Sequence, residues 1–448
     1  MVVSRTFLML GLASAACLSS RAAEPAAYVG RVKSAMLAPL TTEDPDVQRC
    51  AVVLLNCARY NVRWISDTFD MDEARGFYKL TGMKEHGVRP ACSASYGLAT
   101  LLKTGMLDER AVGIERQEAL ARTLKLIKGI AATHKIQRHD GWGDQWQSAL
   151  WAALMGMGAW LLWDDFDDEA RALVAAVVAH EADRFIGYET PYWNGKGGDS
   201  KAAENSWNTM IHNVAVAMMP GHPHARRWKE IASELMVSAY ATKADLEEND
   251  TVLDGRQVKM WLNGYNAQPG GVVVNHGIIH PDYMVAETMS LWAHITQTLA
   301  GTAIPETADF NGALVYKTLV TRAWKSPPYE EPGGTIYRPG VAAVYYPMGV
   351  DWSTHDVSLY YLIDAWAHVL GWDADLPYRA ASWLRPRADE MLRMQRRHDD
   401  RRMFAPGEYD TYPGSEQLVM WCVTDAFWAL WLDAHGADWK TANWLAAK

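Results

Sequence analysis

The stretch from Trp146 to Trp163 constrains the fold more than any other part of the chain. Apart from Gln147 and Ser148 it is almost wholly apolar, and it is long enough for about five turns of helix. A helix that is apolar all round has no face to turn towards water, so other elements must cover it on every side. The sequence therefore predicts an inner helix surrounded by other helices.

Most of the remaining chain also has helical periodicity, and little of it alternates with the period of two that marks a strand. Segment 108–134 is amphipathic, a helix is expected over 93–103 after a loop that ends in Pro90, and short strands are expected only near 271–274 and 342–346. Roughly a dozen helical segments are joined by alternating short turns and long polar loops. This pattern predicts a mainly α fold, in which helix pairs close into an α/α toroid, incomplete or (α/α)6 barrel-like, with few short strands.

The first 22 residues have the composition of a secretory signal peptide. Arg5 precedes an apolar run over 7–16, and small residues lead to a cleavage site after Ala22 or Ala23. No later run reaches the roughly 18 uninterrupted apolar residues of a membrane helix. We therefore expect residues 1–22 to be a signal peptide and residues 23–448 to form a single α/α-toroid catalytic domain, secreted or periplasmic, without a membrane span.

Charge and aromatic content narrow the choice of partner. The chain has 43 Lys and Arg against 53 Asp and Glu, a net charge of −10, and removal of the leader makes it more acidic. Phosphate binding needs clustered Lys and Arg, so nucleic acid is not expected as a partner. The chain also has 21 Trp and 19 Tyr, and such amphipathic rings line ligand grooves. These features favour a carbohydrate, which can be acidic if the cleft is locally basic.

The candidate catalytic residues lie in the polar stretch 261–283, which glycines and a proline interrupt. Loops on a rigid scaffold are where binding and catalytic residues gather. Pro281 suits the first position of a helix and Asp282 the positive end of its dipole, so a helix should begin at His280 or just after it. The residues expected to converge there are Asn275, His276, His280 and Tyr283, with Asn263 and Tyr265 earlier in the stretch.

The spacing of His276 and His280 raises the question of a metal site. A zinc-protease helix carries Glu directly after its first His, whereas this chain has Gly277 there. Hydrogen bonds from the two imidazoles to loop carbonyls would be a purely structural alternative. We therefore expect no metal and no cofactor.

These residue types suit β-elimination on a uronic acid. The proton on C5 lies α to a carboxylate and is weakly acidic. Its removal needs a base, and a second group must neutralise the carboxylate as enolate-like charge builds. Asn can neutralise that charge as a hydrogen-bond donor, His or Tyr can act as the base, and Tyr can protonate the leaving glycosidic oxygen.

Asn275 followed by His276, with Tyr283 close behind, resembles the catalytic set of the α/α-toroid polysaccharide lyases, which include alginate, chondroitin and heparinoid lyases. The resemblance implies that Asn275 binds the carboxylate, that His276 is the base or the charge neutraliser, and that Tyr283 or Tyr265 is the acid. It also implies a nearby arginine. The nearest candidates for that arginine are Arg256 and Arg338.

A second polar cluster lies in 198–213. If this segment is helical, Glu204, Asn208 and His212 fall on one face, with Asn205 beside them. A polar stripe on an otherwise apolar helix can form a groove wall, with Asn205, Asn208 and His212 as substrate contacts. It can equally be a buried hydrogen-bond network that ties loops together.

A polar, aromatic loop before the apolar helix offers two carboxylates, Asp140 and Asp144. An inverting glycoside hydrolase needs two carboxyl groups about 6.5–9.5 Å apart, so these two, with Glu204, are the candidates for a hydrolase on the same fold. Asp beside Gly more often forms a turn or a cap. Trp142 and Gln145 could equally line a sugar subsite.

Three further residues stand in loops that could border a groove. They are His355, Glu408 and Tyr412. The chain has no G-x-S-x-G elbow, P-loop or dinucleotide fingerprint, which argues against several enzyme classes. The leading hypothesis is an exported lyase acting on an acidic polysaccharide or oligosaccharide. The alternatives are an α/α-toroid hydrolase and a carbohydrate-binding protein without catalysis.

Overall fold

The computed structural model describes residues 24–40, 44–351, 357–408 and 411–446. The predicted signal peptide, 1–22, lies outside the described residues. Within them the fold is mainly helical, as the sequence predicts. No helix in this part of the chain is long and apolar enough to cross a membrane.

Helices follow one another along the chain, with loops and short hairpins between them. The α-helices are α2 Pro45–Thr68, α3 Glu85–Lys103, α4 Glu109–Val112, α5 Arg116–Ala132, α6 Ser148–Leu161, α7 Asp168–Asp183, α8 Ala202–Met218, α9 Ala225–Ala239, α10 Lys243–Glu248, α11 Val258–Trp261, α12 Pro281–Val285, α13 Trp292–Ala300, α14 Gly312–Thr321, α15 Val357–Val369, α16 Ala381–Gln395 and α17 Ser415–Ala434. The 3-10 turns are η1 Ser34–Leu37, η2 Trp163–Asp165 and η3 Ala286–Met289. The strands form antiparallel pairs: β1 Met71–Asp72 with β2 Phe77–Tyr78, β3 Val252–Leu253 with β4 Arg256–Gln257, β5 Val274–Asn275 with β6 Ile278–Ile279, and β7 Ala323–Trp324 with β8 Gly334–Thr335.

Three predictions of local structure are wrong. The amphipathic segment 108–134 is two helices and not one, because Gly113, with positive φ, ends α4 before α5 begins at Arg116. The stretch 342–346 forms no strand. The helix expected to begin at residue 93 begins at Glu85 instead and carries Pro90 inside it. Proline removes one backbone donor, but Val88 and Ala91 on either side of it are fully buried. Burial of this apolar face outweighs the lost hydrogen bond.

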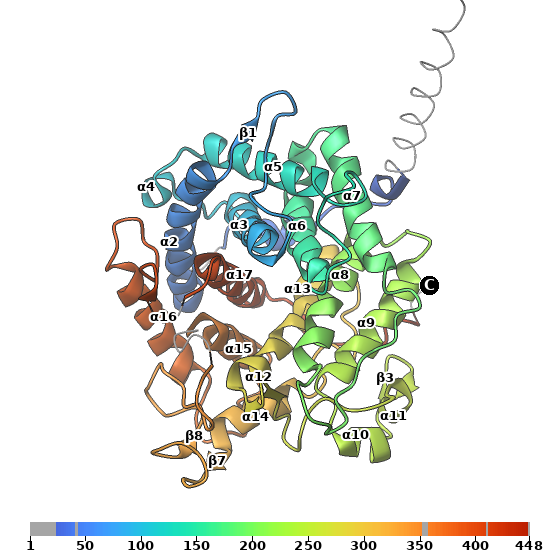
Figure 1. Cartoon of the computed structure of the whole chain (residues 1–448), viewed down its shortest axis with the longest axis vertical. Helices are drawn as coiled ribbons and strands as arrows, with labels where there is room; N and C mark the ends of the chain where they lie inside the picture. The colour runs from blue at the N-terminus through green and yellow to red at the C-terminus, as the bar shows by residue number, and fades with distance from the viewer. Residues whose placement is uncertain (1–23, 41–43, 352–356, 409–410, 447–448) are drawn as a thin grey trace, which may run out of the picture.

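α6 is the inner helix that its composition predicts. Every residue from Ser148 to Leu161 is buried, and the helix packs against α3, α5, α7 and α8. In Figure 1, α3, α6, α8, α13, α15 and α17 lie towards the middle of the molecule, with α2, α5, α7, α9 and α16 around them. The most deeply buried helices thus lie inside those that keep a solvent-exposed face.

A buried carboxylate joins three of these inner helices. Asp425 on α17 accepts hydrogen bonds from the Tyr96 hydroxyl on α3 and from Trp292 Nε1 on α13, both at 2.8 Å. Its side chain is almost entirely removed from water, and burial raises its pKa to about 7. A polar group is tolerated in a core only when its hydrogen bonds are made. This contact therefore fixes how the three helices sit against one another.

Asp425→Ala should destabilise the fold by about 2–4 kcal/mol, because it leaves the buried Tyr96 hydroxyl and Trp292 indole without an acceptor. The folded protein also holds a proton on Asp425 that the unfolded chain, with a carboxyl pKa of about 4, releases as pH rises. The free energy of unfolding should therefore fall between about pH 4 and pH 7, and Asp425→Asn should lack that part of the pH dependence. Urea unfolding at a series of pH values measures both effects. An unchanged midpoint for Asp425→Ala would contradict the role given to this carboxylate.

Candidate functional site

A pocket of about 240 Å³ opens where several inner helices begin. The first two turns of α3, α6, α8, α15 and α17 all contribute to its wall. Residues lining it include Arg89, Trp146, Trp207, Asp282, Tyr283 and Tyr412. Helix N-termini carry partial positive charge, which favours an anionic ligand. The carboxylates of Glu85 and Asp282 also line the pocket, and Glu85 pairs with Arg89 at 2.7 Å.

His276 and Gly277 form the two-residue turn of the β5–β6 hairpin. Asn275 pairs with Ile278 across the turn, and both turn residues have positive φ, +51° for His276 and +78° for Gly277. Positive φ at both central residues is characteristic of a type I′ turn, which glycine enters without strain. The backbone N–H of His276 donates to Asp199 Oδ1 at 2.6 Å. His276 is therefore presented from a fixed backbone.

His276, His280 and Asp351 meet at this turn. His276 Nδ1 and His280 Nε2 each contact the Asp351 carboxylate, the second at 3.0 Å. His280 is the residue before α12, which begins at Pro281 as predicted. The ring centroid of Tyr283 lies 5.6 Å from that of His276 and 4.7 Å from that of His280. The structure thus brings three of the residues proposed for catalysis together, with Asp351 as an unforeseen partner.

A buried carboxylate lies behind His280. Asp282 Oδ1 accepts hydrogen bonds from the hydroxyls of Tyr346 and Tyr360, and Asp282 Oδ2 lies 3.7 Å from His280 Nδ1. Burial raises the pKa of Asp282 to about 6, although the hydroxyl donors act to lower it. The two tyrosines therefore hold Asp282 in place beside the imidazole.

Tyr283 connects this group to the pocket, because its side chain forms part of the pocket wall. Burial raises its pKa to about 12, and the carboxylates of Asp351 and Asp199 act in the same direction. Burial also lowers the pKa of His280, against the raising effect of Asp351. At neutral pH the phenol therefore keeps its proton and the buried imidazole is mostly uncharged.

The other predicted residues of this stretch are placed differently. Asn275 is buried beside the turn, and within the described part of the chain its Oδ1 has no hydrogen-bond partner. The backbone N–H of Tyr265 donates to Asn194 Oδ1 at 3.0 Å, and its hydroxyl lies over Gly195. Asn263 is exposed. Of the residues predicted in this stretch, only Tyr283 is among the described residues that line the pocket. Asn275, His276, His280, Tyr265 and Asn263 are not.

Three of the polar residues predicted on α8 point into the core. Asn205, Asn208 and His212 are at most 2% exposed. Asn205 Nδ2 donates to Ser238 Oγ at 2.9 Å, and His212 Nδ1 lies 2.9 Å from the Asn208 carbonyl oxygen. Burial lowers the pKa of His212 to about 4, so the ring is neutral. α8 presents Trp207 to the pocket, and a substrate role for the three polar residues stays a prediction.

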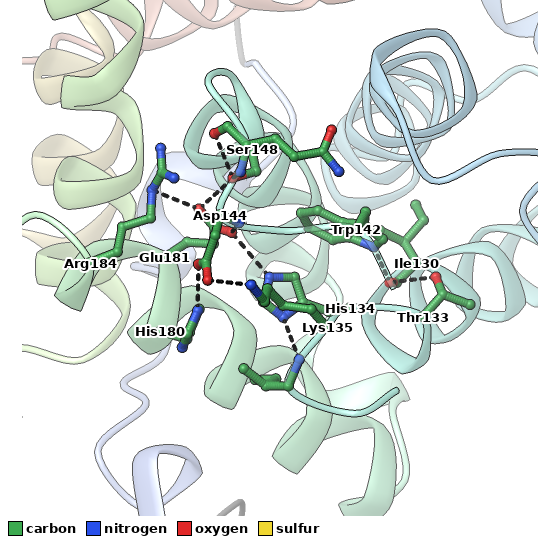
Figure 2. Close-up of polar contacts among 12 residues, drawn as sticks. Ile130, Thr133, His134, Lys135, Trp142, Asp144, Ser148, His180, Glu181 and Arg184 are labelled. Carbon is green, nitrogen blue, oxygen red and sulfur yellow. Dashed lines mark hydrogen bonds and ion pairs between the residues drawn. The ribbon is translucent and has the colours of Figure 1, made fainter. Parts of the chain in front are cut away.

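The loop before α6 is anchored by its aromatic and amide side chains. Trp142 is fully buried and donates from Nε1 to the Ile130 carbonyl at 2.9 Å, as Figure 2 shows. Gln145 is half-buried and donates to the Met83 carbonyl at 2.8 Å. Trp142 therefore has no exposed face for a sugar in this structure. The loop instead delivers Trp146, which is 57% exposed, to the pocket.

The carboxylates considered for a hydrolase are held by neighbouring cations. Asp140 is exposed and pairs with Arg138. Asp144 pairs with Lys135 at 2.7 Å, and Glu204 pairs with a lysine three residues before it. None of the three acids is among the described residues that line the pocket. The structure therefore offers a hydrolase no pair from this set there.

A buried histidine–glutamate pair holds the same loop against α7. His134 Nε2 lies 3.1 Å from Glu181 Oε1, and the Glu181 carboxylate also accepts from Ser148 Oγ at 2.8 Å and from the Asp144 backbone N–H at 3.0 Å (Figure 2). Burial lowers the pKa of His134. Burial acts to raise the pKa of Glu181, but His134 and Arg184 outweigh it and leave that pKa lowered. The pair is thus a neutral imidazole beside an ionised carboxylate.

The three residues predicted in later loops lie in different places. Tyr412 lines the pocket. Glu408 pairs with Arg397 and accepts from the Ala405 backbone N–H at 2.7 Å, so it stabilises its own loop. His355 lies outside the described residues.

Sequence reasoning missed Arg89, Trp207, Asp199 and Asp351. Arg89 lines the pocket, and its guanidinium lies 5.8 Å from the centre of the Tyr412 ring. It stands in a segment predicted as loop, where no helical face could be assigned to it. Asp199 and Asp351 lie more than 70 residues from the histidine turn in sequence, so no local spacing points to them.

Comparison with known proteins adds no identification. No known protein family, curated protein or solved structure matches this chain. The resemblance to the α/α-toroid lyases therefore stays a prediction, and a functional hypothesis has to be built on the geometry of the pocket.

Glu181→Ala should destabilise the protein by roughly 3–5 kcal/mol, because it leaves buried groups of His134 and Ser148 without their partner. Glu181→Gln, which keeps one acceptor oxygen, should cost less. The matched control is Asp140→Ala, which removes an exposed ion pair from the same loop and should leave the unfolding midpoint unchanged. Thermal unfolding of the three variants measures this. Equal losses for Asp140→Ala and Glu181→Ala would show that the buried pair has no special role.

Proposed function

We propose that this protein is an exported polysaccharide lyase that cleaves a uronic-acid-containing glycan by β-elimination. The observation that supports this most is the approach of the His276 ring to that of Tyr283, with 5.6 Å between centroids, because Tyr283 forms part of the pocket wall. A pair of this kind can remove one proton and return another within a single site. Asn275 precedes His276 on the same hairpin and supplies an amide for the carboxylate.

The proposal includes an α/α toroid as the scaffold. Contacts pass from α3 through α6 and α8 to α13, and α17 touches α3, α13 and α15. Each outer helix packs on an inner one: α5 on α3, α7 on α6, α9 on α8, α2 on α17, and α16 on α15. In a toroid the N-terminal ends of the inner helices share one rim. The position of the pocket at those ends supports this arrangement.

The elimination itself needs a base and an acid. The base takes the C5 proton, the C–H electron pair forms the C4=C5 double bond, the C4–O bond breaks with its electrons, and the leaving oxygen takes a proton. His276 and Tyr283 supply these two groups. Asp351 contacts His276 Nδ1 and so orients the ring, which leaves Nε2 for the substrate side.

Asn275 serves to neutralise the substrate carboxylate. This role follows from the resemblance to the α/α-toroid lyases. The Oδ1 of Asn275 has no hydrogen-bond partner among the described residues, so the amide can rotate without breaking a hydrogen bond at that oxygen. The helix N-termini around the pocket add partial positive charge. Arg89 also lies on the pocket wall, where it pairs with Glu85 at 2.7 Å and donates to Gln147 Oε1 at 3.2 Å, so a neighbouring carboxylate already balances its charge.

The first test is the product. The protein should release 4,5-unsaturated uronides, detected by their ultraviolet absorbance, from at least one member of a panel of alginate, pectate, hyaluronan, chondroitin sulfate and heparan sulfate. His276→Ala and Tyr283→Phe should each lower kcat by about 10²- to 10⁴-fold, the usual contribution of a general acid or base. Tyr378→Phe is the control, because it removes a hydroxyl from an exposed tyrosine that does not line the described pocket wall.

Other outcomes would point elsewhere. New reducing ends without ultraviolet absorbance would identify a hydrolase, and binding without any product would identify a carbohydrate-binding protein. Full activity in both His276→Ala and Tyr283→Phe would remove these residues from the mechanism.

Trp146→Ala tests the aromatic part of the pocket. The ring is 57% exposed and stands edge-on to Trp207, with centroids 5.0 Å apart, so it offers an apolar face for a sugar ring. Its loss should raise KM by about 2- to 10-fold, equivalent to about 0.5–1.5 kcal/mol, at nearly unchanged kcat. Because the side chain is exposed, the thermal midpoint should not change. An unaltered KM on every cleaved polymer would place the sugar elsewhere.

A further inference from the structure

We propose that His276, His280 and Asp351 form a binding site for a divalent transition-metal ion, with Zn²⁺ as the best match. One candidate ligand atom from each of the three side chains lies within 4.8 Å of the others. Two imidazole nitrogens and a carboxylate oxygen are a ligand set that zinc and its neighbours take in proteins, with a further position left for water or substrate.

The ligands come from three separate backbone settings. His276 stands on the hairpin turn with its N–H on Asp199, His280 precedes α12, and Asp351 belongs to a loop 71 residues further on. The two histidines do not share a helix, so the helical zinc-protease motif is the wrong template for their spacing. Gly277 is required by the turn that presents His276.

The surroundings of His280 support the assignment. A metal-bound histidine typically donates its second ring N–H to a carboxylate, which fixes the orientation of the ring. His280 presents Nε2 to Asp351, and its Nδ1 lies 3.7 Å from Asp282 Oδ2. Asp282 is in turn held by the hydroxyls of Tyr346 and Tyr360. Asp282 thus stands on the side where a zinc-bound histidine has its outer-shell carboxylate, at 3.7 Å, which is longer than a hydrogen bond.

Charge balance at the site also calls for a cation. Asp199, Asp282 and Asp351 surround the two histidines. In the part of the chain that the structure describes, no lysine or arginine forms an ion pair with any of these three carboxylates. Three acids at and beside the pocket would repel an acidic substrate, and a divalent ion reverses the local field.

A second histidine cluster provides the contrast. His134, His180 and Glu181 also lie close enough together to hold an ion. There, however, Arg184 pairs with Glu181 at 3.1 Å, and Lys135 pairs with Asp144 beside it at 2.7 Å (Figure 2). The protein supplies its own countercharge at that cluster, so no metal is required.

The side chains of His276 and Asp351 are 43% and 34% exposed, so solvent can reach the remaining coordination positions. If the proposed lyase function holds, the ion would bind the uronate carboxylate there and share its neutralisation with Asn275. With the ion bound through Nδ1, His276 would take the charge-neutralising role in place of the acid or base role assigned to it above, and both proton transfers would fall to Tyr283. The metal site itself does not depend on that function.

Metal binding can be measured directly on the whole mature chain. Protein purified without chelator should contain close to one Zn²⁺ per chain by elemental analysis, and chelator-treated protein should bind one Zn²⁺ by calorimetry. Changes to outer-shell residues typically weaken metal binding by roughly 10- to 100-fold. His276→Ala, a change at an exposed turn, removes a ligand and should weaken Zn²⁺ binding by more than that. Asp282→Asn changes an outer-shell residue, so its loss of Zn²⁺ affinity should be about 10- to 100-fold. His180→Ala, in the second cluster, is the matched control and should bind Zn²⁺ as the wild type does.

Three results would overturn the proposal. They are no stoichiometric Zn²⁺ in the wild type, undiminished binding by His276→Ala with an unchanged circular dichroism spectrum, and loss of binding in His180→Ala alone. Activity separates this inference from the lyase hypothesis. Elimination by a chain that binds no metal would refute only the metal site, and Zn²⁺ binding without any elimination would refute only the lyase.

Discussion

The inner helices are buried on almost every side, and the rest of the structure depends on this burial. α6 is buried at every residue, so the layer around it must be packed from all directions. A polar group enters this layer only with its partners, as Asp425 does with Tyr96 and Trp292. Chemistry that needs solvent and substrate is thereby confined to the ends of the helices. The pocket lies at the N-terminal ends, where the backbone itself contributes partial positive charge.

At that end, backbone conformation decides which side chains can meet. Gly277 allows the tight turn that carries His276, and Pro281 starts α12 directly after His280. The two imidazoles are therefore presented from a turn and from a helix start, and Tyr283 follows in the first turn of the helix. The short chain between them brings three rings within 6 Å of one another without a long loop.

Local chemistry made part of this predictable. The apolar run of α6 and the helix start at Pro281 follow from periodicity and from the fixed φ of proline. The start of α3 could not be predicted in this way, because Pro90 suggests a helix boundary there, whereas burial of the surrounding apolar residues keeps the helix intact through it. Polar side chains at helical spacing, such as Asn208 and His212, look the same in a sequence whether they face a groove or the core. Asp351 had no local signal, since only the fold brings it to the histidines.

The two histidine–carboxylate clusters show why residue type alone does not define a site. Each combines two imidazoles with acidic side chains at similar distances. In the cluster of His134, His180 and Glu181, Lys135 and Arg184 neutralise the carboxylates, so the cluster can hold the loop before α6 against α7. In the other, Asp351 is 34% exposed and meets only histidines among the described ion pairs, so charge balance there is left to protonation or to a bound cation. Countercharge depends on residues far apart in sequence, which is why the fold, and not the histidine spacing, separates a structural contact from a site that can bind and react.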